Sequence, residues 1–311
     1  MKLVFCGTPR FAVPTLDALL AAGHEIALVV SQPDRPVGRS QQVVATPVKQ
    51  RAETAGLNVT QPEKIRNNAE FRAQLETIAP NTIVVVAYGR IIPPWMLALP
   101  RLGCINLHAS LLPKYRGAAP IQWAVAMGET VTGNTTMLLE EGLDTGPILL
   151  QQEIAIRREQ TASDLFDVLA EAGAPLVVET LAALANGSIQ PKTQDHSRAT
   201  LAPLLEREDG RMDFTAHTAT ELWNRWRGFQ PWPGVFTTLD GKKLIAHRMQ
   251  VSEYTSSGLP AEVRVENQRM LVACTGNTWI EMIELQLEGK KRLAAAEFLR
   301  GTPLPPGTRL G

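Results

Sequence analysis

Thr82-Ile-Val-Val-Val-Ala87 is the stretch of this sequence that decides the fold. A short run of β-branched residues without polar alternation is typical of a strand buried on both faces, as strands of a parallel sheet are. Two apolar runs, Lys2–Cys6 and Glu25–Ser31, precede it, and two more, Gly103–His108 and Thr135–Glu140, follow it. Helical patterns lie between these runs. The alternation predicts an α/β domain with a parallel sheet.

The expected helices begin and end at ordinary signals. Thr46-Pro47 supplies a capping residue and a first-turn proline, and Thr161-x-x-Asp164 resembles a capping box. Glycine ends several of these segments, as it commonly does after a helix. The predicted helical segments are Ala12–Ala22, residues 47–56, Asn68–Ala79, Pro120–Gly128 and a long region from residue 161 to Asn186-Gly187.

A second domain is predicted after a change in composition. Ser188–Asp209 is polar and contains proline, as a linker does. We therefore expect a first domain over residues 1–189, a linker over 190–208 and a second domain over 209–311. The second domain should begin with a helix, Ala216–Arg227. Short strands are then predicted at Val235–Leu239, Leu244–Val251, Ala261–Val265, Met270–Cys274 and Thr278–Leu287, a pattern that favours an OB-like β-barrel.

Charge and composition bound the possible partners. The chain has 31 basic and 31 acidic side chains, so no global positive field attracts nucleic acid. The N-terminal sequence is not a secretory signal, and no apolar run reaches the roughly 20 residues of a membrane-spanning helix. Three widely spaced cysteines exclude a C-x-x-C zinc site and argue against a disulfide framework. We expect a soluble, cytosolic protein that acts without a metal ion or a membrane.

The strand Gly103–His108 carries the first candidate catalytic residues. Alternation places Cys104, Asn106 and His108 on one face, near the carboxyl end of the strand, where α/β sheets bind ligands. If the following strand is a neighbour, Asp144 in the loop after it can reach His108. For each of these residues taken alone, a structural role is more frequent than a catalytic one. Asn-x-His at a strand end is usually a satisfied turn or cap, and Asp before Thr-Gly is usually a turn former.

The spacing of several motifs adds to this case. Asn106-x-His108-x-Ser110-Leu-Leu-Pro113, Arg116-Gly117, Pro120 and Gly142-Leu-Asp144-Thr-Gly146 resemble the signature of the 10-formyltetrahydrofolate-dependent formyltransferases. The motifs that resemble the methionyl-tRNA branch of this family are Phe5–Ala12, Gln32–Arg39, Val86–Gly89, Pro231–Gly234 and Gly289-Lys-Lys291. The resemblance implies a Rossmann-like formyltransferase domain, an OB-like barrel that contacts tRNA, and formyl transfer to initiator methionyl-tRNA.

The resemblance also implies roles for individual residues. Asn106 is the expected donor to the oxyanion, His108 shares that role or moves the amine proton, and Asp144 orients His108. The expected folate-binding residues are Ala87, Tyr88, Gly89, Arg90, Ile91, Ile92, Ser110, Leu111, Leu112, Pro113, Leu139 and Asp144. Without the resemblance, Ile91–Pro94 is equally well interpreted as a plain buried loop.

The expected tRNA-binding residues fall in two regions. They are Arg35 and Arg39 in an insertion loop over Gln32–Val48, and Lys242, Lys243, Arg248, Lys290 and Lys291 in the barrel. Ser40-Gln41-Gln42 stands where relatives often carry a glycine and lysines, so this loop is less basic than theirs. It has few large apolar residues, and we expect it to have little packing of its own. Each barrel cluster is explained at least as readily as solvated surface. We expect a monomer.

Three alternative functions remain to be compared with this one. A sugar-nucleotide N-formyltransferase shares the Asn-His-Asp residues, but the Gly7-Thr-Pro9 start and the Gly289-Lys-Lys291 segment disfavour it. A nonenzymatic tRNA-binding protein has no use for an intact triad. A dehydrogenase is disfavoured because Cys6-Gly7-Thr8-Pro9 is not a G-x-G-x-x-G phosphate-binding loop.

Overall fold

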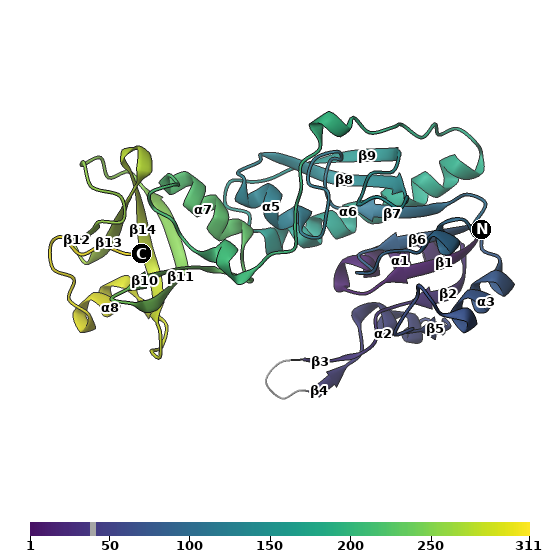
Figure 1. Ribbon diagram of the computed structural model, residues 1–311, viewed down its shortest axis with the longest axis horizontal. Helices are drawn as coiled ribbons and strands as arrows, with labels where there is room; N and C mark the ends of the chain where they lie inside the picture. The colour runs from purple at the N-terminus through teal and green to yellow at the C-terminus, as the bar shows by residue number, and fades with distance from the viewer. Residues whose placement is uncertain (38–41) are drawn as a thin grey trace. The chain divides into compact units, whose positions relative to one another are not determined.

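The computed structural model describes residues 1–37 and 42–311, and these residues form two compact units (Figure 1). The first unit comprises Met1–Pro120, Val131–Ala155 and Leu165–Ala202, and the second comprises Ile121–Thr130, Ile156–Asp164 and Pro203–Gly311. The units cross the predicted borders at residues 189 and 209. Most of the predicted linker packs on the first unit, where Ala202 N–H donates to the Arg116 carbonyl (2.7 Å). Two short stretches of the predicted first domain pack with the second unit.

A seven-stranded sheet with the order β5-β2-β1-β6-β7-β8-β9 forms the centre of the first unit. Its strands are β1 (Lys2–Gly7), β2 (Glu25–Val30), β5 (Val59–Thr60), β6 (Thr82–Val86), β7 (Cys104–His108), β8 (Val131–Leu138) and β9 (Ile148–Ala155). The five strands from β5 to β7 are parallel, as predicted, and β6 is buried throughout. The strands β8 and β9 add an antiparallel edge that the pattern did not predict. β9 lies at this edge, and half of its residues are exposed, so its sequence lacks a continuous apolar run.

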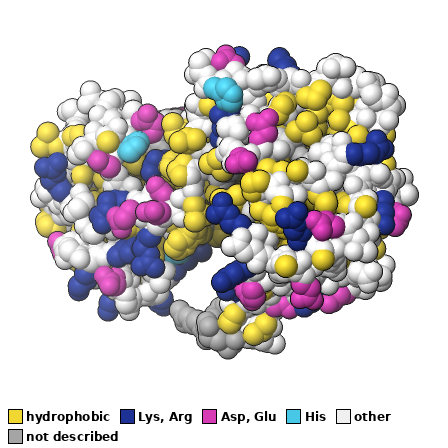
Figure 2. Space-filling view, turned by 45° about the vertical axis from the view of Figure 1, so that its right-hand side comes forward, with side chains coloured by type: hydrophobic (Ala, Val, Ile, Leu, Met, Phe, Trp, Pro, Cys, Tyr) yellow, Lys and Arg dark blue, Asp and Glu magenta, His cyan; other side chains and the backbone are white. Residues whose placement is uncertain are grey.

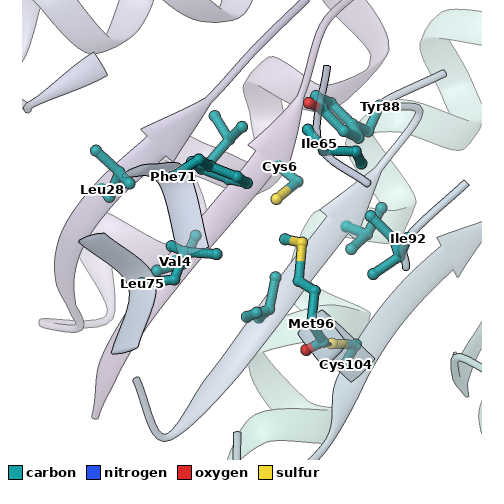
Figure 3. Packing of buried hydrophobic residues seen from close by; sticks show 13 residues of the cluster. Val4, Cys6, Leu28, Ile65, Phe71, Leu75, Tyr88, Ile92, Met96 and Cys104 are labelled. Carbon is teal, nitrogen blue, oxygen red and sulfur yellow. Dashed lines mark hydrogen bonds between the residues drawn. The ribbon is translucent and has the colours of Figure 1, made fainter. Parts of the chain in front are cut away.

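Helices cover both faces of this sheet. They are α1 (Val13–Ala21), α2 (Pro47–Thr54), α3 (Ala69–Ile78), α4 (Pro94–Leu97) and α6 (Ala162–Ala185). On one face, alternate residues of β1, including Val4 and Cys6, pack with Phe71 of α3 and Met96 of α4 (Figure 3). On the other face α6 lies close to β7, because a Cβ atom at Gly173 would meet the Leu107 side chain at 2.6 Å.

The helix α6 corrects one expectation from the sequence. By length and composition it could cross a membrane, with a mean hydropathy of 1.6, although no such stretch was predicted. Polar residues interrupt its apolar pattern in the sequence. The side chains of Leu165, Leu169, Val177 and Leu181 are fully buried in the unit. Such contacts are typical of a core helix, and a core helix can have the same length and hydropathy as a membrane-spanning one.

The insertion loop has more structure than predicted. Its strands β3 (Arg35–Val37) and β4 (Gln42–Val44) pair as an antiparallel hairpin. Asp34 anchors the hairpin, since its carboxylate accepts from Lys49 Nζ and from Gln61 Nε2, each at 2.6 Å. These two donors hold the pKa of Asp34 below its usual value. The predicted contact residue Arg39 lies outside the described residues.

The second unit is an antiparallel β domain with the strand order β10-β11-β14-β13-β12, and β15 pairs with β14. Its strands are β10 (Val235–Leu239), β11 (Lys242–Ser252), β12 (Val263–Glu266), β13 (Arg269–Cys274), β14 (Thr278–Leu287) and β15 (Leu293–Ala294). The five predicted strands are confirmed. The C-terminal residues link the two edges, because Leu310 N–H donates to the Ala261 carbonyl and Gly311 N–H to the Thr238 carbonyl, both at 3.0 Å. This link gives the barrel-like closure expected of an OB-like domain.

Helices α5 (Pro120–Ala126), α7 (Ala219–Gly228) and α8 (Ala295–Gly301) belong largely to this second unit. Gly228 at the end of α7 packs directly on α5. A Cβ atom there would lie 2.6 Å from both the Ala126 nitrogen and the Gln122 carbonyl oxygen, which are backbone atoms and cannot turn aside. Arg227, which is buried, donates to the Gln160 carbonyl at 2.9 Å and so attaches the 156–164 stretch.

We expect Gly228→Ala to destabilise the second unit by about 1–3 kcal/mol, the usual cost of overpacking. Urea unfolding monitored by tryptophan fluorescence measures this change, because Trp123 and Trp223 lie in the helices concerned. Gly301→Ala in α8 is the matched control, since nothing lies within 4 Å of a Cβ atom there. Equal unfolding midpoints for the two variants contradict the close contact between α7 and α5.

Candidate active site

The candidate active site lies where strands of the first unit end. The strands β1 and β6 are neighbours from which the chain continues in opposite directions, and such switch points are where open α/β sheets bind ligands. The loops that follow these strands are joined, because Thr8 Oγ1 donates to the Tyr88 carbonyl at 3.0 Å. The next strand, β7, ends at His108. The predicted catalytic strand therefore ends beside the predicted folate-binding loop.

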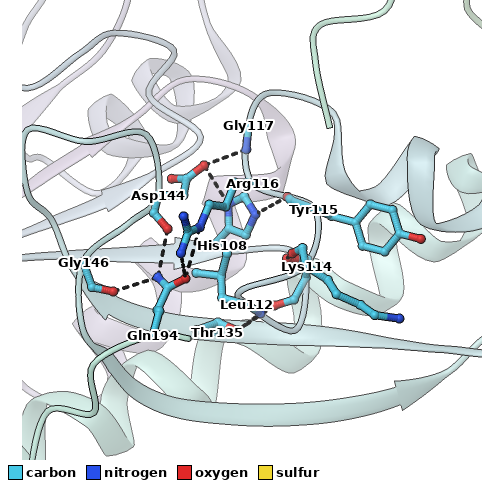
Figure 4. A network of polar contacts seen from close by, with 11 residues as sticks. His108, Leu112, Lys114, Tyr115, Arg116, Gly117, Thr135, Asp144, Gly146 and Gln194 are labelled. Carbon is cyan, nitrogen blue, oxygen red and sulfur yellow. Dashed lines mark hydrogen bonds and ion pairs between the residues drawn. The ribbon is translucent and has the colours of Figure 1, made fainter. Parts of the chain in front are cut away.

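The structure brings His108 and Asp144 together (Figure 4). His108 Nδ1 lies 3.7 Å from Asp144 Oδ2, and both side chains are largely buried. The sequence predicted this contact only if the next strand is a neighbour. β8 is that neighbour, but it runs antiparallel to β7, so the loop after it folds back to bring Asp144 to the histidine.

Hydrogen-bond partners determine how the two polar residues of β7 are presented. His108 Nε2 lies 2.9 Å from the Tyr115 carbonyl oxygen, which only accepts, so Nε2 carries a proton. Nδ1 forms an ion pair with Asp144 when it is protonated too. Asn106 is partly buried, and within residues 1–37 and 42–311 its side chain has no hydrogen-bond partner. The amide donors of Asn106 are thus available to a ligand.

Asp144 is held in a conformation that few residues adopt. Its φ is 49°, in the left-handed region that costs a residue with a side chain roughly 1–2 kcal/mol. The Gly117 N–H donates to Asp144 Oδ2 at 2.8 Å and fixes the carboxylate. Gln194 Nε2 donates to the carbonyls of Asp144 (2.8 Å) and Gly146 (2.7 Å) and fixes the backbone. Gln194 is buried, 3% exposed.

Sequence reasoning missed Gln194. It belongs to residues 192–202, here called the bridging segment, which was assigned to the linker. This segment pairs with both loops of the site. Lys192 exchanges two backbone hydrogen bonds with Ile148, each 2.8 Å, and Arg116 N–H donates to the Thr200 carbonyl at 2.8 Å. The polar composition of the segment resembles that of a flexible linker, and no periodic pattern marks its contacts.

The turn after His108 is fixed by its own polar contacts. Ser110 is completely buried, and its hydroxyl donates to the Lys114 carbonyl at 2.6 Å. Thr135 Oγ1 donates to the Ser110 carbonyl (2.6 Å) and accepts from Leu112 N–H (3.2 Å). The Leu112 side chain packs with Met137 and Ile148. Ser110 and Leu112 therefore shape this loop from inside, although both were predicted to bind folate.

The loop after β6 presents alternate residues to the surroundings. Ala87, Gly89 and Ile91 are exposed, Ile91 by 86%, whereas Tyr88 and Ile92 are buried in the core beneath. The backbone of this loop is held by Gln32, whose Nε2 donates to the carbonyls of Tyr88 (3.2 Å) and Gly89 (3.1 Å). Its Oε1 accepts from Arg90 at 2.8 Å.

The remaining predicted folate-binding residues lie on the loops that follow β7 and β8. Leu111, Pro113 and Leu139 are partly buried, and Leu139 contacts the cluster around Leu112. Leu143, next to Asp144, is 63% exposed. Two exposed apolar side chains, Ile91 and Leu143, thus stand on the two loops that the resemblance assigns to the pterin.

The thiols and the phenol of this region are poor nucleophiles. Burial raises the pKa of the Cys104 thiol to about 12, and it also raises the pKa values of the Cys6 thiol and the Tyr88 phenol. These groups therefore stay protonated at neutral pH and belong to the core. The polar groups left for chemistry are an amide, an imidazole and a carboxylate.

The predicted tRNA-binding lysines of the second unit gather at one end of the barrel. Lys242 and Lys243 begin β11, and Glu288 N–H donates to the Lys243 carbonyl (2.8 Å) just before Lys290 and Lys291. Arg248, farther along β11, is exposed, as is Arg35 in the first unit. Figure 2 shows basic side chains interspersed with acidic ones, in agreement with the neutral composition.

Comparison with known proteins identifies relatives over the whole chain. The family model for formyl transferase matches residues 1–181, and the model for the formyl transferase C-terminal domain matches residues 204–303. The chain is 66% identical over 311 residues to the methionyl-tRNA formyltransferase of Acidobacterium capsulatum, and the match covers 100% of each of the two chains. It is 55% identical to the methionyl-tRNA formyltransferase of Koribacter versatilis, with 100% of this chain and 99% of that one covered.

Solved structures are similar at much lower identity and support the fold alone. An N-formyltransferase from Helicobacter canadensis, in complex with folinic acid and dTDP-3-aminofucose, matches with a TM-score of 0.67 at 18% identity, covering 91% of this chain and 98% of that one. HypX from Aquifex aeolicus, in complex with tetrahydrofolic acid, matches with a TM-score of 0.60 at 15% identity, covering 96% of this chain and 47% of that one.

Proposed function

The chain belongs to the formyl transferase family, and we propose that it transfers a formyl group from 10-formyltetrahydrofolate to the α-amino group of initiator methionyl-tRNA. The 66% identity to a methionyl-tRNA formyltransferase, over the full length of both chains, is the observation that carries this proposal. The buried contact between His108 and Asp144 supports it chemically, as does the Asn106 amide on the same strand, which has no hydrogen-bond partner among the described residues.

The reaction requires attack by an amine on the formyl carbon. An α-amine with a pKa of about 8 or below is substantially neutral at physiological pH and needs no covalent enzyme intermediate. The new C–N bond forms as a tetrahedral intermediate, its oxygen gains negative charge, and the bond to the folate nitrogen then breaks. The amine loses one proton and the folate nitrogen gains one. The products are N-formylmethionyl-tRNA and tetrahydrofolate.

The three polar side chains suit these steps. Asn106 donates to the oxyanion, because its amide is unpaired in the described part of the chain and donors aimed at the developing charge lower the barrier. His108 stabilises the same charge or carries the proton from the amine to the folate nitrogen. Asp144 keeps the imidazole oriented through its 3.7 Å contact with Nδ1 and places a carboxylate beside the proton that His108 handles.

The folate is proposed to lie between the loop after β6 and the loop after β8. Residues Ala87–Ile92 and Leu139–Asp144 offer backbone groups and the exposed side chains of Ile91 and Leu143. An apolar side chain on each side suits a flat ring system, and backbone carbonyls can accept from its amino groups. Residues 110–113 border the same space.

The tRNA is proposed to contact the hairpin of β3 and β4 and the lysine-rich end of the barrel. The exposed cations Arg35, Lys242, Lys290 and Lys291 are suited to local phosphate contacts, in a chain with no overall positive charge, whereas Lys243 is partly buried over the Phe236 ring. The proposed substrate is a component of translation, so we place the protein in the cytoplasm. We propose that it acts as a monomer.

Formylation of charged initiator tRNA with 10-formyltetrahydrofolate tests the proposal. An amino-sugar nucleotide, such as dTDP-3-aminofucose, is assayed beside it because a distant structural relative was solved with that molecule. Formylation of the tRNA alone is the expected result. Formylation of the sugar alone contradicts the proposed acceptor and favours the sugar-nucleotide alternative.

We expect Arg35→Ala to weaken tRNA binding. The slope of log affinity against log salt concentration should become shallower by about one unit, because one phosphate contact is lost. Arg35 lies on β3 with an exposed side chain, at the base of the hairpin that Asp34 anchors. The measurement is tRNA affinity at several salt concentrations. Arg101→Ala is the control, because Arg101 is also exposed but precedes β7, at the opposite end of the strand from His108. Equal slopes for both variants and the wild type exclude a phosphate contact by Arg35.

A further inference from the structure

The contacts of Gln194 are those of a component of the active site. We infer that Gln194, held by Arg116, is a positioning residue that sets the place of the Asp144 carboxylate during formyl transfer. This inference rests on the proposed function. It assigns a catalytic task to the bridging segment, which lies outside the matched family models because they end at residue 181 and resume at residue 204.

The orientation of the Gln194 amide is unambiguous. Its Nε2 faces the carbonyl oxygens of Asp144 and Gly146, which only accept hydrogen bonds. Its Oε1 faces Arg116, whose Nε (3.2 Å) and Nη2 (2.6 Å) only donate. A reversed amide would place donor against donor and acceptor against acceptor. Both ends of this side chain are therefore in use, and one amide joins the two loops of the site.

Arg116 is itself fixed by the bridging segment. Its side chain is 7% exposed, and its Nη2 also donates to His196 Nδ1 at 3.1 Å, so that nitrogen carries no proton. Its backbone pairs with Thr200 and Ala202. The guanidinium therefore cannot follow Gln194 if the amide shifts. It acts as a fixed point from which Gln194 reaches the Asp144 loop (Figure 4).

The Asp144 loop needs such support. The left-handed backbone at Asp144 is unfavourable in isolation and persists only where neighbouring contacts impose it. The loop cannot relax by moving toward β8. The backbone at Gly146 already lies against the end of that strand, since a Cβ atom there would be 1.9 Å from the Leu138 carbonyl oxygen. Two carbonyls of this loop share one donor group. Loss of that group releases the segment that carries the carboxylate toward His108.

Gln194→Glu tests this role without emptying the site. The glutamate keeps the size of the side chain and can still accept from Arg116, but it places an oxygen against the two carbonyls. We expect kcat for formyl transfer to fall by about tenfold to a hundredfold, as small displacements of catalytic groups do. The thermal unfolding midpoint should change little, because the pair with Arg116 is retained. Gln190→Glu is the matched control, since Gln190 is exposed on the same stretch of chain.

A second readout does not depend on activity. The Gly117 N–H donates to the Asp144 carboxylate, so its rate of hydrogen exchange reports whether that carboxylate is in place. By NMR on the full chain, we expect Gly117 exchange to accelerate by about tenfold or more in Gln194→Glu and in Gln194→Met, and to be unchanged in Gln190→Glu.

The outcomes separate this inference from the proposed function. Wild-type protein that formylates no tRNA defeats the proposed function, while Gly117 exchange still decides what Gln194 does. Unchanged Gly117 exchange in both Gln194 variants overturns the positioning role. So does wild-type kcat in Gln194→Glu when the wild type is active. Loss of kcat together with faster exchange and an unchanged unfolding midpoint supports it.

Discussion

Asn106→Ala is expected to lower kcat for formyl transfer by roughly a hundredfold or more, because one donor to a developing oxyanion contributes about 3–4 kcal/mol. The residue lies on β7 with its side chain partly buried, and in the described part of the chain no hydrogen bond inside the protein uses its amide. The unfolding free energy should therefore change little. Steady-state kinetics at saturating folate and tRNA give the value of kcat.

The same position allows a sharper comparison. Asn106→Asp preserves the shape of the side chain but replaces its donor by an acceptor that repels an oxyanion, so kcat should fall at least as far as in Asn106→Ala. Asn67→Ala is the control, because Asn67 is exposed before α3. A kcat within a few-fold of wild type for Asn106→Ala removes this residue from the mechanism. An equal loss in Asn67→Ala points instead to a general effect of the substitution.

The grouping of Asn106 and His108 could be predicted because strand geometry is local. Alternation along five residues fixes which side chains share a face, and the position of the strand end follows from the loop signals after His108. Cys104, the third member of that face, packs into the core with Met96, as the apolar end of a strand should. Local strand geometry was therefore sufficient to predict that Asn106 and His108 share a face at the end of the strand.

The contact of Asp144 with His108 needed information that local patterns lack. The sequence could state only that neighbouring strands allow it. Whether β8 runs parallel or antiparallel to β7 depends on the connection through the 109–130 stretch, part of which packs in the second unit. The resemblance to formyltransferases supplied the pairing. In the structure a fold-back of the loop, with Asp144 at positive φ, produces it.

Gln194 shows most clearly which contacts cannot be predicted from the sequence. Its partners lie 48 to 78 positions away along the chain, and its own surroundings in sequence are polar and aperiodic. A buried amide that satisfies four groups looks the same, in sequence, as an exposed amide in a linker. The compact units of the structure differ from the predicted domains for the same reason. Polar composition predicts exposure to solvent, whereas polar side chains in the bridging segment form internal hydrogen bonds.

His108→Ala is expected to produce the other large loss, between about a hundredfold and ten-thousandfold in kcat, which is the range for removal of a group that transfers protons or stabilises charge. Asp144→Asn should lower kcat by an amount approaching this. The asparagine oxygen still accepts from Gly117 N–H, so the loop stays in place and only the charge facing His108 Nδ1 is lost. Asp167→Asn, at an exposed ion pair with Arg10, is the control for loss of an acidic charge in the same unit.

The double variant decides whether Asp144 works through His108. Groups that act as one unit give losses that do not add, so His108→Ala with Asp144→Asn should have nearly the kcat of His108→Ala alone. The 3.7 Å contact between the two buried side chains is the structural reason for this expectation. If the two losses multiply, Asp144 contributes independently of the imidazole, for example by binding folate directly. The carboxylate then does not act through its contact with His108. In that case the KM for 10-formyltetrahydrofolate should rise in Asp144→Asn and stay at the wild-type value in His108→Ala.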